Sequence, residues 1–276
     1  MSRKLLSTLF VAAGLAVALA GCGEDKKAAA PAPQAAAQTT TLKVGASPVP
    51  HADILNFVKP TLEKEGVKLE VIEFSDYVQP NLSLADKELD ANFFQHKPYL
   101  DEFAKSHNLK LDVLVAVHLE PMGVYSHKVK NVNDIPQGGK IAIPNDPING
   151  GRALKVLESA GLIKVKPEAG VLATVADIVE NPKNLSFAEI EAAQLPRSLD
   201  DVSAAVINSN FALGANLNPT KDAIAVESKD SPYANIVVIR QGDNREALQK
   251  LKAVLTTPDV KKFLEEKYKG AVLPAF

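Results

Sequence analysis

The sequence contains a single cysteine, Cys22, and no tryptophan among its 276 residues. One cysteine cannot form a disulfide within the chain, so packing alone must hold the folded part together. Aromatic residues make up only 5% of the chain. A local concentration of tyrosine and phenylalanine is therefore informative.

The sequence also lacks an excess of charge of either sign. It has 31 Lys and Arg against 33 Asp and Glu, a formal charge of −2, and no basic stripe. We therefore expect no nucleic-acid partner. The charge and composition fit an ordinary globular protein.

Motifs for catalysis and metal binding are missing as well. The five histidines show no i, i+4 helical pair and no carboxylate-rich context of the kind that binds zinc. No Gly-x-Ser-x-Gly elbow is present, and no local motif marks a set of Ser, His and Asp. We expect no metal, no cofactor and no catalytic residue, and hence a protein that is not an enzyme.

The one long apolar run is at the N-terminus. Arg3 and Lys4 precede an apolar stretch from Leu5 to Ala20, which ends in Leu19-Ala20-Gly21-Cys22. A charged segment, an apolar segment and a small-residue cleavage site together predict a lipoprotein signal peptide over residues 1–21, with lipidation of Cys22. A transmembrane or core helix is the alternative, but a span needs roughly 20 predominantly apolar residues and this run is slightly short.

Alanine, proline and glutamine dominate the segment after Cys22. Without a hydrophobic period it cannot bury enough apolar surface to offset its chain entropy. We predict a flexible lipidated linker over residues 22–41 and an ordered body from Leu42. The protein is then expected in the cell envelope, anchored to a membrane through Cys22 and facing the periplasm or the outer face of the membrane. Which membrane holds the anchor stays open.

Strands and helices alternate through the body, which predicts an α/β fold with mainly parallel sheets. If the strand at residues 236–240 returns to the first sheet, the body has two α/β lobes joined by two crossing segments. Lobe 1 would comprise residues 42–124 and 236–276, and lobe 2 residues 125–235. A ligand cleft is expected between them, beyond the carboxyl ends of the strands.

The segment Asn145-Asp146-Pro147-Ile148-Asn149-Gly150-Gly151-Arg152 lies between a predicted strand and a helix expected from Gly151. Free N–H groups at a helix start favour an anion, and a guanidinium can grip a carboxylate through two hydrogen bonds. The segment is therefore either a carboxylate clamp with Arg152 as its charged half or a glycine turn with an exposed arginine. The spacing alone does not decide between them.

Two further groups of residues lie at or near the ends of predicted strands. Tyr77 and the run Phe93-Phe94-Gln95-His96-Lys97-Pro98-Tyr99 suggest a wall for an apolar or thioether side chain, although core packing is the alternative for the phenylalanines. Asn208, Asn210 and Asn235 could accept hydrogen bonds from an ammonium group, although asparagine also favours turns.

Six motifs occur in one order along residues 42–276. They are Ser75-Asp76-Tyr77-Val78, Asp90-Ala91-Asn92-Phe93-Phe94-Gln95-His96-Lys97-Pro98-Tyr99-Leu100, Pro144-Asn145-Asp146-Pro147, Glu180-Asn181-Pro182-Lys183-Asn184-Leu185, Leu195-Pro196-Arg197-Ser198-Leu199-Asp200-Asp201 and Ser231-Pro232-Tyr233-Ala234-Asn235. In that order they resemble the NlpA lipoprotein family, the methionine-binding lipoproteins of ABC importers.

The resemblance implies a two-lobed periplasmic-binding-protein fold, type II-like, that closes over free L-methionine and delivers it to a permease powered by an ATPase. By motif, Tyr77, Phe94, His96 and Tyr99 would line the thioether pocket. Arg152 would pair with the carboxylate. Asn149, Asn208 and Asn235 would contact the ligand's backbone groups.

Other functions stay open at this stage. The same fold could bind D-methionine, a methionine-containing dipeptide or another apolar amino acid. A lipid-anchored surface or scaffold protein without a transport role is a second class. A lipid-anchored hydrolase is a third, although it lacks an identifiable nucleophile and base.

Overall fold

The computed structural model describes residues 39–276. The predicted signal peptide, the lipidation site Cys22 and nearly all of the predicted linker lie outside the described residues. Within residues 39–276, no helix combines the length and the apolar character that crossing a bilayer requires.

The first sheet has six strands in the order β13, β4, β12, β3, β1, β2. β1 is parallel to β2 and β3, whereas β12 is antiparallel to both β3 and β4. A strand from late in the chain thus lies at the centre of a sheet built mainly from its first third. The bounds are β1 (Thr40–Ala46), β2 (Val67–Glu73), β3 (Ala91–His96), β4 (Leu111–Leu119), β12 (Ala234–Arg240) and β13 (Leu273–Pro274).

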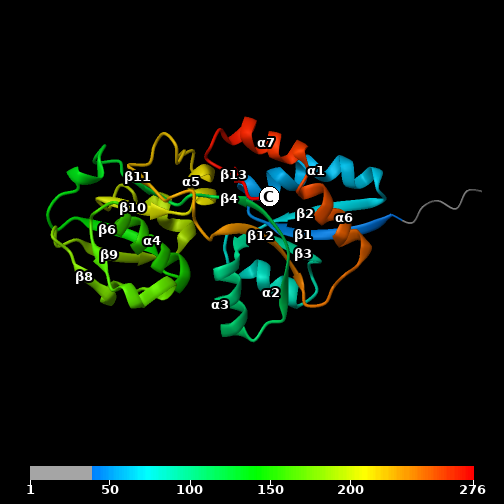
Figure 1. Cartoon of the computed structure of the whole chain (residues 1–276), viewed down its shortest axis with the longest axis horizontal. Helices are drawn as coiled ribbons and strands as arrows, with labels where there is room; N and C mark the ends of the chain where they lie inside the picture. Colours follow the sequence, from blue (N-terminus) through cyan, green and yellow to red (C-terminus); the bar gives the residue numbers. More distant parts are fainter. Residues whose placement is uncertain (1–38) are drawn as a thin grey trace, which may run out of the picture. The chain divides into compact units, whose positions relative to one another are not determined.

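Helices cover both faces of this sheet (Figure 1). α1 (Asp53–Lys64), α6 (Glu246–Leu255) and α7 (Pro258–Tyr268) lie on one face, and α2 (Gln79–Ala85) and α3 (Lys97–His107) lie on the other. Successive side chains of β12 point to opposite faces of the sheet, so this one strand packs against the helices on both faces. Val237 and Ile239 join the cluster that contains α1, α6 and α7, whereas Ile236 and Val238 pack with Leu84 of α2 and Leu100 of α3.

The second sheet has five strands in the order β11, β5, β10, β6, β9. Its bounds are β5 (Gly123–Tyr125), β6 (Lys140–Pro144), β9 (Ser186–Ile190), β10 (Ala204–Ile207) and β11 (Ala225–Val226). Its central strand β10 is buried on both faces in the same way as β12. Ala204 and Val206 pack with the core beneath α4 (Pro147–Ser159), whereas Ala205 and Ile207 pack on the opposite side, beside Ala212 of α5 (Ser209–Gly214).

The remaining elements are short. β7 (Lys164–Val165) and β8 (Ile178–Glu180) form a two-stranded pair. The helical turns are η1 (Pro48–Ala52), η2 (Val132–Asp134), η3 (Pro167–Leu172), η4 (Val175–Asp177) and η5 (Ala192–Ser198).

The boundaries between sheets differ from the predicted ones. β5 begins at Gly123 and pairs with β10, so residues 123 and 124 belong to the second sheet, and β12 begins at Ala234 rather than at 236. The chain crosses between the sheets at residues 120–122 and 227–233. The hydrophobic pattern could not locate the first crossing segment, because apolar residues continue through it. Met122 lies in the crossing segment and Val124 lies in β5, and both are fully buried.

The ordered body also begins earlier than Leu42. Thr40 and Thr41 pair with Val67 and Lys68 of β2, so the end of the predicted linker belongs to the first sheet. Their side chains are exposed, which is why no hydrophobic pattern marked them.

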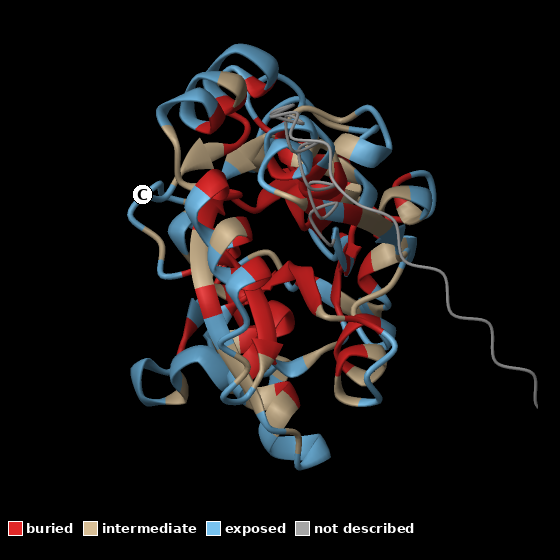
Figure 2. Ribbon diagram, turned by 90° about the vertical axis from the view of Figure 1, so that its right-hand side faces the viewer, coloured by how far each residue is buried: buried red, intermediate tan, exposed pale blue. Residues whose placement is uncertain are grey.

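The buried residues of both sheets and of the helix faces turned toward them form the cores (Figure 2). Leu55 of α1 is fully buried, whereas Leu172 in η3 is 48% exposed. Truncation of a buried leucine removes transfer energy and leaves a cavity. The two residues therefore make a matched pair for testing the core.

We expect Leu55→Ala to lower the free energy of unfolding by about 2–5 kcal/mol, and Leu172→Ala to change it by no more than about 0.5 kcal/mol. Urea denaturation of the full chain, followed by circular dichroism, measures both. Equal destabilisation by the two substitutions would contradict the assigned core.

Candidate functional site

The central pocket lies among residues of both sheets and of the first crossing segment, and its empty space, including space open to solvent, is about 320 Å³. All eight residues that the sequence singled out line it, together with four others. The lining consists of Tyr77, Phe94, Gln95, His96, Tyr99, Glu120, Asn149, Arg152, Asn208, Ser209, Asn210 and Asn235.

An aromatic wall forms one part of the pocket. The ring centroid of Tyr77 lies 5.8 Å from those of Phe94 and Tyr99, and 4.9 Å from that of Phe211. The Tyr99 hydroxyl donates to the backbone carbonyl of Tyr77 at 2.9 Å, which fixes the two rings relative to each other. The pocket also contains a link between the sheets, because the Tyr77 hydroxyl donates to Asn210 Oδ1 at 2.5 Å.

Phe93 is not part of this wall. Neighbouring residues of a strand point to opposite faces, so Phe94 faces the pocket while Phe93 is fully buried in the core of the first sheet. Core packing, the alternative considered for both phenylalanines, describes Phe93, whereas Phe94 lines the pocket and also packs with Tyr99 and Phe103.

His96 connects the first sheet to α4. Its Nδ1 accepts the backbone N–H of Tyr99 at 3.2 Å and caps α3. The ring proton is therefore on Nε2, which donates to Asn149 Oδ1 at 3.2 Å. Burial, with a smaller contribution from Arg152, lowers the pKa of His96 to about 3, so this histidine is neutral at physiological pH.

The predicted clamp segment has a different local structure from the expected one. α4 begins at Pro147 and not at Gly151, because Asp146 caps the helix by accepting the N–H of Asn149 at 2.9 Å and proline is favoured at the first helical position. Arg152 is consequently inside the helix and not at its start. Gly151 serves packing, since a Cβ there would lie 2.4 Å from the carbonyl oxygen of Val171.

Arg152 is 3% exposed and already holds a carboxylate. Its Nε and Nη2 donate to the two oxygens of Glu227 at 2.9 and 2.6 Å, and Nη2 also donates to the backbone carbonyl of Glu120 at 2.8 Å. The guanidinium carbon lies 4.3 Å from the ring centroid of Tyr233. Within residues 39–276, Nη1 makes no hydrogen bond and is left for a further acceptor.

Two acidic residues of the site were missed by the sequence analysis. Glu120 follows the end of β4, the same position relative to a strand that marked Tyr77, but it was not considered. Glu227 follows β11, a two-residue strand that the sequence did not predict. They lie in different crossing segments, and Arg152 contacts both.

The amides of the pocket differ in how far they are paired. Asn149 Oδ1 accepts from both His96 and Asn208, and its Nδ2 donates to Asp146. Asn208 Oδ1, by contrast, is buried without a hydrogen-bond partner among the described residues. A buried acceptor without a partner costs about 1–3 kcal/mol, which makes it a natural place for a ligand's donor.

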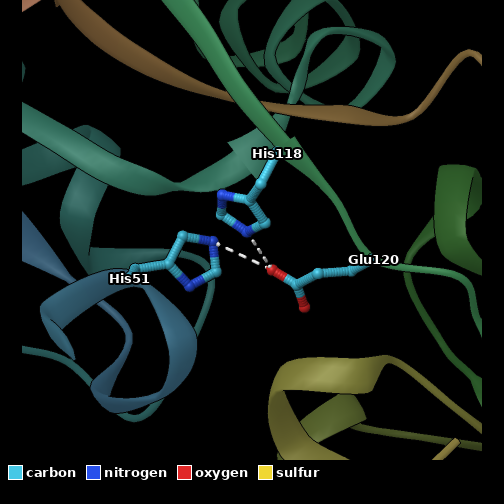
Figure 3. A group of neighbouring side chains, drawn as sticks. All are labelled: His51, His118 and Glu120. Atoms are coloured by element: carbon cyan, nitrogen blue, oxygen red, sulfur yellow. Dashed lines mark hydrogen bonds and ion pairs between the residues drawn. The ribbon is translucent and has the colours of Figure 1, made fainter. Parts of the chain in front are cut away.

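A cluster that sequence spacing did not predict consists of His51, His118 and Glu120 (Figure 3), of which Glu120 lines the pocket. The Nε2 atoms of His51 and His118 point toward Glu120 Oε1, at 3.3 and 2.6 Å. Two histidines and a carboxylate can serve as metal ligands in general. Here both Nε2 atoms face hydrogen-bond acceptors, since His51 Nε2 also lies 2.9 Å from Asn235 Oδ1, and we interpret the cluster as a hydrogen-bonded one.

The chain is similar to known methionine-binding proteins in sequence and in structure. The family model of the NlpA lipoproteins matches residues 42–276. A Vibrio cholerae protein named probable D-methionine-binding lipoprotein MetQ is 42% identical over 274 residues, which cover 99% of this chain and 98% of the relative. The Escherichia coli D-methionine-binding lipoprotein MetQ is 43% identical over 234 residues, 84% of this chain and 82% of the relative.

Solved structures give the same result. A nutrient-binding protein from Burkholderia cenocepacia, bound to methionine, superposes with a TM-score of 0.83 at 49% identity and covers 85% of this chain and all of its own. The methionine-binding protein MetQ superposes with a TM-score of 0.83 at 39% identity, over 86% of this chain and 98% of its own. The predicted α/β periplasmic-binding-protein fold is confirmed, and the chain belongs to the NlpA lipoprotein family.

Proposed function

We propose that this protein is the substrate-binding lipoprotein of an ABC importer and that it captures free methionine in the pocket between its two sheets. The pocket offers separate groups for each part of a zwitterionic amino acid that has an apolar side chain. The printed names of the relatives, which are methionine-binding lipoproteins, support the same cargo.

The ligand carboxylate binds at Arg152. Nη1 is the guanidinium nitrogen left without a hydrogen bond by Glu227 and the Glu120 carbonyl. Asn235 Nδ2 is a second donor without a partner in the described part of the chain, because only the Oδ1 of this amide is engaged, by His51. In a water-poor cavity such charge-assisted bonds are stronger than at the surface.

The ligand ammonium binds at Glu120 and Asn208. Glu120 is 4% exposed and supplies the carboxylate among the pocket-lining residues. Asn208 Oδ1 is the buried acceptor without a partner. This orphaned acceptor is the observation that carries the proposal, since it predicts a hydrogen-bond donor inside the pocket.

The ligand side chain lies against the rings of Tyr77, Phe94 and Tyr99. A thioether sulfur near an aromatic ring contributes about 0.3–1.5 kcal/mol, and burial of its methylenes adds to that. His96, neutral and fixed through both ring nitrogens, borders the same space without introducing a charge.

L-methionine is the proposed enantiomer. D-methionine is the second candidate, because the relatives' printed names specify it. Both enantiomers place the same three groups in the pocket, so calorimetric titration with each decides between them.

The proposed role is transport and not catalysis. The lipid on Cys22 would tether the protein to a membrane of the cell envelope, facing the periplasm or the outer face, and the ligand-bound form would deliver methionine to a permease and its ATPase. If both lobes contact the ligand, methionine binds more tightly to a closed form, in which the lobes meet around it, than to an open form. Ligand binding then shifts the population toward the closed form.

We expect Arg152→Ala to weaken methionine binding by at least about 100-fold, because it removes the cation opposite the ligand carboxylate. Isothermal titration calorimetry on the detergent-solubilised full chain measures this. Arg197→Ala, which removes an exposed arginine, is the matched control and should bind as the wild type does. Unchanged affinity in a folded Arg152→Ala protein would refute the assignment.

We expect Tyr77→Ala to weaken methionine binding by about 10-fold through loss of ring contact, with little effect on alanine, whose side chain does not reach the wall. Tyr77→Phe keeps the ring and should retain this preference for methionine. Competition titrations with both amino acids test the point, and an equal loss for the two would place the ligand side chain elsewhere.

A further inference from the structure

Glu120 is a buried carboxyl group, and the Nε2 atoms of two histidines face one of its oxygens. His118 Nε2 lies 2.6 Å and His51 Nε2 3.3 Å from Oε1. Figure 3 shows the two rings on one side of the carboxyl group, with the second oxygen directed away from them. One oxygen is therefore engaged by the histidines while the other is directed elsewhere.

The surroundings determine which ring nitrogens carry protons. His51 Nε2 faces two acceptors, Glu120 Oε1 and Asn235 Oδ1, and an ionised carboxylate can only accept. His118 Nε2 faces the same carboxyl oxygen. Beside an ionised Glu120, both histidines are therefore neutral Nε2–H tautomers. His118 donates to Glu120, whereas His51 donates to Asn235 Oδ1 and its Nε2 lies 3.3 Å from Glu120 Oε1.

The far sides of the rings keep these histidines neutral. Within residues 39–276, Nδ1 of His51 and Nδ1 of His118 are buried without hydrogen-bond partners. A second proton on the His118 ring would find no acceptor, and at His51 the backbone of Val49 favours the protonated form less than burial opposes it. Burial accordingly lowers the pKa of His51 to about 4 and that of His118 to about 3. The two rings can direct N–H groups toward Glu120 without adding positive charge.

We propose that His51 and His118 are positioning residues for Glu120: their Nε2–H groups hold its carboxylate as an oriented anion, ready for the ammonium group of an amino-acid ligand. The inference rests on the proposed function, since Glu120 is the ammonium partner there. Neutral donors suit this task because they stabilise the anion and leave its net charge for the ligand. A lysine or arginine in their place would cancel that charge.

Other groups also face Glu120 and set its protonation. Burial raises the pKa of this carboxyl above its ordinary value, while His51, Arg152 of α4 and the backbone N–H of Asn210 in α5 act in the opposite direction. Burial, with a smaller contribution from the charge of Glu120, raises the pKa of Tyr77. Burial and Asp53 raise the pKa of Tyr268, to which Glu120 contributes less. Arg152 is shared with Glu227, so its help to Glu120 is partial.

The pH dependence of methionine affinity distinguishes positioning from mere packing. As the pH falls through the pKa of Glu120, its carboxyl takes up a proton and the affinity drops, whereas the amine of methionine stays protonated. Removal of one N–H donor raises the pKa of Glu120 further. The acid limb of the affinity profile is the pH range in which methionine affinity falls as the pH is lowered. We expect His118→Phe to move this acid limb to a higher pH by about one unit, and His51→Phe to move it in the same direction.

Matched variants separate charge stabilisation from shape. His118→Gln keeps an amide N–H donor near the position of Nε2 and should return the acid limb toward that of the wild type. His127→Phe replaces a histidine whose side chain is half exposed and paired with Asp200, and should leave the profile unchanged. Calorimetric titrations of the full chain with methionine between pH 4 and 8 give the profiles of the wild type and of the four variants.

Nitrogen NMR of the histidine rings in the wild-type full chain tests the tautomers without any substitution. Protons on Nε2 of both rings are expected, and a proton on Nδ1 of either ring overturns the proposal. So does an unshifted acid limb in His118→Phe and His51→Phe, or tight zinc binding that is lost in His118→Gln, which would make Nε2 a metal ligand. If the wild type binds no methionine at all, the proposed function is wrong. That result differs from the ones that overturn only the role of the two histidines, so the two hypotheses can be rejected separately.

Discussion

One guanidinium connects both segments through which the chain passes between its sheets. Arg152 donates to the backbone of Glu120 in the first crossing segment and to the carboxylate of Glu227 in the second. A charge buried to this degree must be paired, and removal of one partner from a buried pair costs about 3–5 kcal/mol. The position of Arg152 therefore constrains the pocket and the two crossing segments together.

The rest of the pocket follows from how each buried polar group is satisfied. Asn149 is fully bonded and joins α4 to the first sheet through His96. Within residues 39–276, Asn208 retains an acceptor and Arg152 a donor without a hydrogen-bond partner. Because buried polar groups are usually paired, the proposed function assigns the polar groups of the ligand to these atoms.

The sequence predicted what local patterns encode. Alternating strands and amphipathic helices predicted the α/β body, and the resemblance to the NlpA lipoprotein family assigned the eight side chains that line one pocket. The start of α4 was misplaced because two glycines suggested a loop, whereas Asp146 and Pro147 were the stronger helix signals. The sheet boundaries at residues 123 and 234 were missed because buried apolar residues occur on both sides of each crossing.

Interactions between residues far apart along the chain could not be predicted from the sequence. His51 and His118 are 67 positions apart, and no spacing rule brings their rings to one carboxyl oxygen. Glu227 was equally hidden, since nothing local shows that it pairs with Arg152 across 75 positions. Such contacts depend on the completed fold, in which β4, α4 and the turn at η1 meet at the same edge of the pocket.

The most direct test of the account is a crystal structure of the protein grown with selenomethionine as the ligand, in which the anomalous signal locates the side-chain selenium. The account predicts a selenium peak against Tyr77, Phe94 and Tyr99, with the ligand carboxylate at Arg152 and its ammonium at Glu120 and Asn208. A selenium peak beside Arg152, or outside the pocket, would contradict it.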